Sequence, residues 1–230
     1  MRLTSTFGRA TLAVALLALP GPAAATSNQT YKPNEYKVVT GGLSPDRKVS
    51  IRAHGNGELG MENFHIYLFR ENPEKRIGAL EEIVELDTAA DAFTAKWTPD
   101  SQAVAIQYRV DRHVFGVQAY TLANNRAYPI SGPSLVEQVT GKSPEALRAS
   151  PMMEETEWTW TGTSTFRLVV DAAYRGNAGA LVKAFGRFGK RGEDIDDNVG
   201  TVAFSAEAEC ELVPPSGYRV ISLKPGSFSK

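Results

Sequence analysis

The side chains best placed for chemistry form an acidic loop in the last fifth of the chain. Asp194, Asp196 and Asn198 stand at alternate positions, the spacing by which a looped chain turns successive oxygens toward one calcium ion. Gly200 comes one position later than the glycine of an EF-hand, and Ser205 stands where that motif has its glutamate. The loop is therefore interpreted either as a weak calcium site or as a solvated hairpin tip.

A second candidate site is a pair of indole rings, Trp158 and Trp160. Two residues apart on an expected strand, they share one face of the sheet. Indole rings on an exposed sheet can stack on a sugar or on a side chain of a partner. The alternative is that both pack into the core, with Thr159 and Thr161 on the outer face.

Other catalytic and metal chemistries find little support in the sequence. It has no nucleophile elbow, zincin helix, phosphate-binding loop or dinucleotide fingerprint. His54, His65 and His113 lack the spacing of a zinc site. Cys210 is the only cysteine, which excludes an intramolecular disulfide and a cysteine-rich zinc site. We predict no catalytic residue and no cofactor beyond the possible calcium.

The elements that would position these residues are mostly strands. Apolar residues alternate with polar ones from Val202 to Leu212, and three glutamates occupy the polar face. Cys210 then points inward as a small core residue. Further strands are expected at 49–53, 65–69, 104–110, 115–122, 158–170, 180–188 and 218–223. One short helical segment is expected near residues 134–148.

A weak internal repeat runs through the first half. Ser44-Pro45-Asp46 precedes one expected strand, and Thr98-Pro99-Asp100 precedes another 54 residues later. Proline fixes one backbone angle and the aspartate can fold back on the main chain, so each triplet predicts a tight turn. Trp160-Thr161-Gly162 echoes Trp97-Thr98-Pro99 and suggests a degenerate third copy.

This pattern resembles the TolB-like, WD40-like β-propeller repeats of bacterial envelope proteins, over Leu43 to Ile130. The glycine that usually follows the aspartate is replaced by Arg47 in one copy and by Ser101 in the other. The resemblance implies a small or incomplete propeller, and a β-sandwich is the alternative. We predict one mainly β, antiparallel domain over residues 26–230. It has blade-like units at 43–96 and 97–150 and a C-terminal β region at 151–230.

The first 25 residues have the three parts of a secretory signal peptide. Arg2 and Arg9 give a positive start, and an apolar run from Ala10 to Leu19 follows. A small-residue segment then ends at Ala25, near which we expect cleavage. The run is about half the roughly 20 residues of a membrane span. We therefore expect export to the periplasm or the medium, without a membrane span and, with no nearby cysteine, without lipidation.

Charge and composition narrow the expected partners. Cleavage removes two arginines and no acid, so the formal net charge of −1 becomes about −3. This balance gives no electrostatic footprint for nucleic acid. We expect an exported, non-enzymatic envelope protein that binds another envelope protein.

Two other functions remain open. An exported hydrolase would recruit its carboxylates from the pairs Glu81–Glu82, Glu154–Glu155 or Asp196–Asp197. A carbohydrate-binding module would use Trp158 and Trp160.

Overall fold

The computed structural model describes residues 26–81, 83, 86–196 and 198–228. The predicted signal peptide lies outside these residues. Thirteen strands and two α-helices are found in this part of the chain, which confirms the mainly β prediction. Hydrogen-bonded neighbours form one open path of mixed sheet from β11 to β4. No helix within the described ranges is long and apolar enough to span a membrane.

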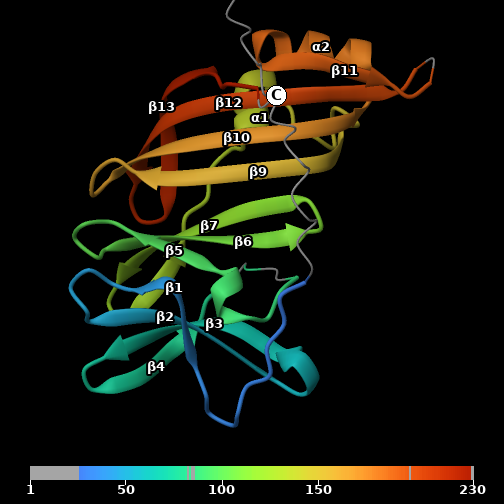
Figure 1. The fold of residues 1–230 in the computed structure, drawn as a ribbon. Coiled ribbons are helices and arrows are strands. Elements are labelled where there is room, and N and C mark those ends of the chain that lie inside the picture. Colours follow the sequence, from blue (N-terminus) through green and yellow to red (C-terminus); the bar gives the residue numbers. More distant parts are fainter. Residues whose placement is uncertain (1–25, 82, 84–85, 197, 229–230) are drawn as a thin grey trace, which may run out of the picture.

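The strands are organised as three successive four-stranded antiparallel meanders (Figure 1). The first contains β1 (Lys37–Leu43), β2 (Val49–Asn56), β3 (Glu62–Glu71) and β4 (Glu74–Ala79). The second contains β5 (Thr94–Trp97), β6 (Ala103–Asp111), β7 (Val114–Ala123) and β8 (Arg126–Pro129). The third contains β9 (Ser150–Trp160), β10 (Thr165–Gly176), β12 (Gly200–Val213) and β13 (Gly217–Pro225).

The two predicted turns have the same hydrogen bonds. The Ser44 hydroxyl accepts from Val49 N at 3.2 Å, and the Thr98 hydroxyl accepts from Ala103 N at 3.0 Å. Each turn joins the first strand of its meander to the second. β1 precedes the first turn and was not predicted from the sequence. It contains two adjacent glycines and shows little alternation of apolar and polar residues.

The residue after the aspartate is left-handed in both turns. Arg47 has φ 56° and Ser101 has φ 62°, the region that glycine adopts most readily. Both turns therefore have a left-handed residue at this position although neither residue is glycine. The Ser101 hydroxyl also accepts from Asp46 N at 3.2 Å, so the two turns contact each other.

Tryptophan side chains link the first strands of the three meanders. Trp97 Nε1 donates to the carbonyl of Gly41 in β1 at 3.0 Å, and Trp160 Nε1 donates to the carbonyl of Lys96 in β5 at 2.8 Å. A side chain at Gly41 would meet Ala95 O at 2.4 Å, so only glycine permits this approach of β1 to β5. The echo between Trp97 and Trp160 in the sequence thus corresponds to similar contacts, each with a carbonyl in the first strand of the preceding meander.

Two apolar cores lie on opposite faces of the second meander. Val104, Ile106 and Tyr120 belong to the first core, whereas Ala105 and Ala119 belong to the second. The first core comprises Tyr31, Val39, Ile51, Ala53, Phe64, Ile66, Leu68, Leu80, Ala90, Phe93, Ala95, Val104, Ile106, Tyr108 and Tyr120. The second comprises Ala105, Ala119, Ile130, Leu135, Val136, Ala149, Trp158, Phe166, Leu168, Val170, Ala172, Tyr174, Ala178, Leu181, Phe185, Phe188, Val202, Phe204, Ala206, Ala208 and Cys210.

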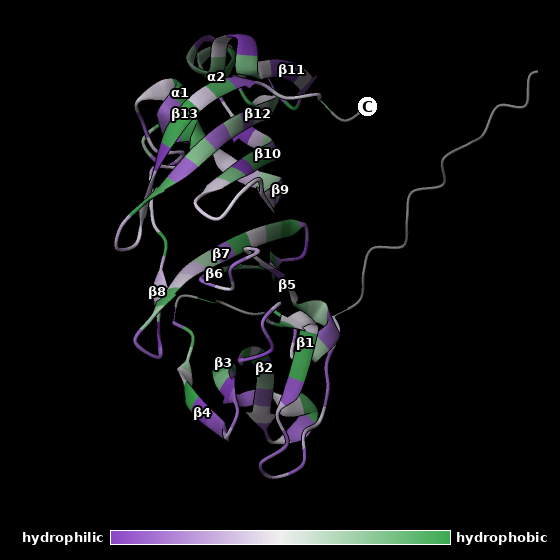
Figure 2. Ribbon diagram, turned by 90° about the vertical axis from the view of Figure 1, so that its left-hand side faces the viewer, coloured by the Kyte–Doolittle hydropathy of each residue, from purple (hydrophilic) through white to green (hydrophobic). Residues whose placement is uncertain are grey.

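The third meander confirms the alternation that the sequence predicted. Hydrophobic and hydrophilic residues alternate along β12 (Figure 2), and its apolar residues are buried in the second core. Cys210 has no exposed surface, and burial raises the pKa of its thiol to about 12. The predicted inward orientation of this cysteine is confirmed.

Two helices cover part of the second core. α1 (Leu135–Thr140) lies in the predicted helical segment, with Ser134 and Glu137 forming a capping box. α2 (Ala178–Phe185) shows that the strand predicted at 180–188 is wrong, as is the prediction of a single helix. Asn177 caps α2, and Ala178, Leu181 and Phe185 are buried at helical spacing. After α2 the chain forms β11 (Gly189–Asp194), which pairs with β12.

A buried ion pair anchors the segment that precedes β1. Arg109 of β6 binds Asp87 through Nε and Nη2 at 2.9 and 2.6 Å, and both side chains are 5% exposed. Asp87 Oδ1 also accepts from Ser27 N at 2.6 Å, while Thr88 N and Ala89 N donate to Ser27 O. The N-terminal segment is thereby held against the first core.

We predict that Asp87→Asn strongly destabilises the fold. Breaking a buried ion pair by neutralising one partner costs about 3–5 kcal/mol, because the other charge stays buried. Chemical denaturation followed by circular dichroism measures the loss. Asp111→Asn is the control: Asp111 lies on β6 with Arg109 but is exposed, so its effect should stay within about 0.5 kcal/mol. Equal stabilities of the two variants would contradict the structural role of the pair.

Candidate functional site

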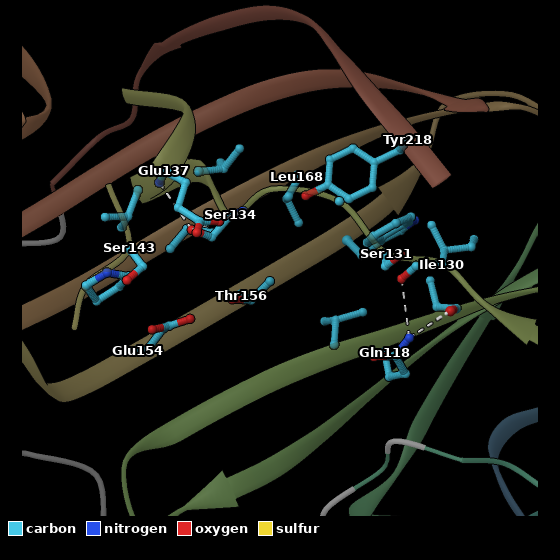
Figure 3. Close-up of a pocket in the computed structure, with 18 of the residues that line it drawn as sticks. Gln118, Ile130, Ser131, Ser134, Glu137, Ser143, Glu154, Thr156, Leu168 and Tyr218 are labelled. Atoms are coloured by element: carbon cyan, nitrogen blue, oxygen red, sulfur yellow. Dashed lines mark hydrogen bonds between the residues drawn. The ribbon is translucent and has the colours of Figure 1, made fainter. Parts of the chain in front are cut away.

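A cleft of about 520 Å³ opens where the second and third meanders meet α1 (Figure 3). Its walls come from β7, β9 and β10, from α1 and the turn after it, and from Tyr218 of β13. The residues around it are Val117, Gln118, Ala119, Ile130, Ser131, Gly132, Ser134, Leu135, Val136, Glu137, Ser143, Pro144, Glu145, Glu154, Thr156, Trp158, Leu168, Val170, Tyr174 and Tyr218. The cleft therefore lies at a junction between repeated units.

Strand alternation decides which residues of β9 face the cleft. Glu154, Thr156 and Trp158 lie two residues apart and all line it. Glu155, between them, is exposed and stands opposite Asp171 on the other face of the sheet. The two carboxylates of this predicted pair therefore point in opposite directions, as adjacent residues on a strand must.

Glu154 is the carboxyl with the most unusual surroundings in the cleft. It is half-buried, and burial raises the pKa of its side chain above the ordinary value for glutamate. The Tyr174 hydroxyl, 3.4 Å from Oε2, opposes this shift, as does the hydroxyl of Thr156. Among the described residues, no lysine, arginine or histidine forms an ion pair with Glu154.

The other two carboxyl groups of the cleft are already engaged. Glu137 Oε2 accepts from Ser134 N at 2.9 Å and from the Ser134 hydroxyl at 3.2 Å, completing the cap of α1. A hydrogen bond from Ser143 lowers the pKa of Glu145. These groups add negative charge to the rim, whereas Glu154 supplies the carboxyl within the cleft.

Of the predicted tryptophan pair, Trp158 lies at the inner wall of the cleft and in the second core, and Trp160 packs against that core outside the cleft. Trp158 is 5% exposed, and its ring stacks on Phe166 with centroids 3.7 Å apart and planes at 11°. Trp160 is half-buried and donates to Lys96 O as described above. Core packing, the alternative stated for this pair, is the arrangement observed.

Polar contacts fix the opposite end of the cleft. Gln118 Nε2 donates to Ala119 O at 3.0 Å and to Ile130 O at 3.4 Å (Figure 3). The Tyr218 hydroxyl donates to Pro133 O at 2.8 Å, and burial raises the pKa of this phenol to about 12. Both side chains are therefore held in place before any ligand enters.

The predicted calcium loop forms a hairpin tip between β11 and β12. Asp196 Oδ1 accepts from Asn198 N at 2.9 Å and from Val199 N at 2.8 Å, which closes the turn. Asp194 forms an ion pair with Arg191 at 2.8 Å. Asp197 of the third predicted carboxylate pair lies outside the described residues.

Histidine residues do not converge either. His54 Nδ1 lies 2.7 Å from Glu35 O and its ring packs on Tyr36, whereas His65 and His113 are exposed. Across the described ranges, no group of three or more histidine, cysteine or acidic side chains could hold a metal ion.

The chain was compared with family models, with curated proteins and with solved structures, and none of them matches. The functional interpretation of the cleft therefore rests on the geometry of its side chains.

Most of the cleft was not predicted from the sequence. Trp158 was proposed for binding and Glu154 only as half of a hydrolase pair, and the structure brings both to one wall. Gln118, Glu137 and Tyr218 were not singled out. The strand expected at 158–170 is in fact the end of β9, a turn and the start of β10, so the alternation of Glu154, Thr156 and Trp158 along β9 was missed. Which face of β9 meets α1 depends on tertiary packing.

We predict that calcium leaves the thermal stability unchanged. Asp194 Oδ1 accepts from the Arg191 guanidinium and Asp196 Oδ1 from two backbone donors, so a calcium ion would have to bind beside the positive charge of Arg191. Differential scanning calorimetry in calcium and in EDTA should give the same melting temperature. A higher melting temperature in calcium would restore the calcium interpretation of the loop.

We also predict that Glu154→Gln stabilises the protein at neutral pH. Because burial raises the pKa of Glu154, the native wild type loses stability as the pH rises from the unfolded-state pKa through the raised native one. The neutral amide avoids this loss, so the gain should vanish as the pH falls toward about 4.3, the ordinary value for glutamate. Urea denaturation between about pH 4.3 and neutral pH measures the difference in free energy of unfolding between the variant and the wild type, with Glu155→Gln as control. A gain that does not depend on pH would contradict the assignment.

Proposed function

We propose that this chain is an exported, non-enzymatic binding module whose partner inserts into the cleft between the second and third meanders. The observation that carries the proposal is the cleft itself, an open cavity at a junction of repeated units with one unpaired carboxyl inside. Concave sites with apolar walls and a few fixed polar groups are the usual form of binding sites.

An incomplete propeller-like arrangement is part of this proposal. The two equivalent turns support a relation between the first two meanders, and one tryptophan bond joins each meander to the next. The junctions differ in their strand pairing, β1 with β5 and β7 with β9, so the propeller-like arrangement is an irregular one. In such an arrangement the clefts between units are places where partners contact loops and strand ends. Another envelope protein fits the predicted exported location better than nucleic acid, because the mature chain is mildly acidic.

The side chains of the cleft favour binding over hydrolysis. General acid–base catalysis with two carboxylates needs both to be available to the substrate. Glu137 and Ser134 are bound to each other in the helix cap, and Glu155 lies on the opposite face of β9. Stacking of a sugar on Trp158 is also disfavoured, because Phe166 covers one face of its ring.

Photo-crosslinking tests the proposal directly. A benzoylphenylalanine at Ser131, an exposed residue of the rim, should crosslink the mature protein to an envelope component in its native host. Thr156→Trp and Val117→Phe fill the cleft and should abolish the adduct. Thr159→Trp, on the same strand but the opposite face, should retain it. Circular dichroism establishes that each variant folds.

The outcomes distinguish binding in the cleft from binding elsewhere on the surface. An adduct that disappears only with the two cleft-filling variants supports the proposed function. An adduct of equal yield in Thr156→Trp, Val117→Phe and Thr159→Trp, or no adduct at all, would overturn it.

A further inference from the structure

We infer that the cleft binds a primary ammonium group carried on an aliphatic chain, with Glu154 as its counter-ion. The inference rests on the proposed function, since it names the chemistry of what enters the same cleft. It is argued from the charge of the walls, the state of Glu154 and the apolar surface beside it.

The charge of the cleft has one sign. Three of its side chains are glutamates, Glu137, Glu145 and Glu154, and none of the residues that line it is lysine, arginine or histidine. Low-dielectric walls around charges of one sign concentrate ligands of the opposite charge. A cationic group is therefore favoured over a neutral or an anionic one.

Glu154 lacks the partner that a partly buried carboxylate requires. Only two neutral hydroxyls, those of Tyr174 at 3.4 Å and of Thr156, contact its carboxyl, and it forms no ion pair within the described part of the chain. Burial of a charge is costly unless the charge is paired and hydrogen-bonded. An ammonium group brings three donors and a compensating charge to this position.

An aliphatic stem is accommodated by the walls next to Glu154. Val117 of β7 and Leu168 and Val170 of β10 present apolar surface to the cleft, and Trp158 closes its inner side. Lysine-like stems bury their methylene groups on such surface while the charged end pairs with a carboxylate. The ligand class is thus an alkylammonium rather than a compact inorganic cation.

Two sources share this chemistry, the side chain of a lysine in a protein partner and a free alkylamine. Isothermal titration calorimetry compares acetyl-Ala-Lys-Ala-amide with n-pentylammonium on the mature protein. 1-Pentanol and hexanoate serve as the neutral and anionic probes of similar length. Tighter binding of the peptide assigns the cleft to a lysine side chain, and tighter binding of n-pentylammonium assigns it to a free amine.

Variants of adjacent residues give a matched comparison. Glu154→Gln should weaken the binding of either ammonium probe by about tenfold or more, since it removes a partly buried charge partner. Glu155→Gln, one residue away on the opposite face, should change it by less than about twofold, as expected for an exposed charge.

The dependence of affinity on pH adds a second readout. The titratable residues in direct contact with Glu154 are Tyr174 of β10, which hydrogen-bonds its carboxyl, and His113, whose backbone carbonyl accepts from Glu154 N. Glu137 of α1, Glu145 of the turn after it and Tyr218 of β13 also line the cleft. Burial raises the pKa of both phenols, so neither ionises near neutral pH. Affinity for n-pentylammonium should fall as the pH drops through the pKa of Glu154, and Glu154→Gln should remove most of this dependence.

These measurements test the ammonium assignment independently of the proposed function. Equal affinity for 1-pentanol and n-pentylammonium, unchanged affinity in Glu154→Gln, or no binding of either ammonium probe would overturn the ammonium assignment. The Ser131 crosslink would still stand in those cases, because it reports occupancy of the cleft whatever the chemistry of the partner.

Discussion

The second meander packs against an apolar core on each of its faces. The first and third meanders can be placed on either side of it because of this double burial. Along β6, Val104 and Ile106 enter the first core while Ala105 enters the second. Burial on both sides gives Ala103 to Ile106 a continuous apolar run, whereas polar residues alternate with apolar ones over the rest of β6. The small side chains of Ala105 and Ala119 meet the large residues of the third meander, whereas larger residues meet the first. The buried pair of Arg109 and Asp87 adds a polar anchor beside the first core.

The cleft follows from how the third meander is joined to the second. The first two meanders are connected by residues 80–93 and contact each other through their turns. Between the second and third, the chain inserts α1 and the turn that contains Pro144. α1 and this turn form one wall of the cleft, and Trp158 and Val117 form another. The additional helix and turn at the junction of β7 and β9 have therefore produced a cavity lined by residues from five different elements.

Local features of the fold were predictable, and contacts between distant residues were not. The turns at Ser44 and Thr98 and the inward face of β12 follow from residue types and spacing over a few positions. α2 was mistaken for a strand because its apolar run is short, although the Asn177 cap was visible in the sequence. The surroundings of Glu154 depend on Tyr174, twenty residues away, and on α1. No spacing rule connects these residues before the chain folds.

Cys210 has a further consequence for how the opening of this sheet can be followed. The thiol lies near the C-terminal end of β12, between β10 and β13, with no exposed surface. Thiolate is the reactive form of cysteine, and both burial and the raised pKa withhold it from a reagent in the native state. Alkylation must therefore wait until β12 separates from its neighbours. The rate of labelling at this single native position then reports how often the third meander opens, without an introduced probe.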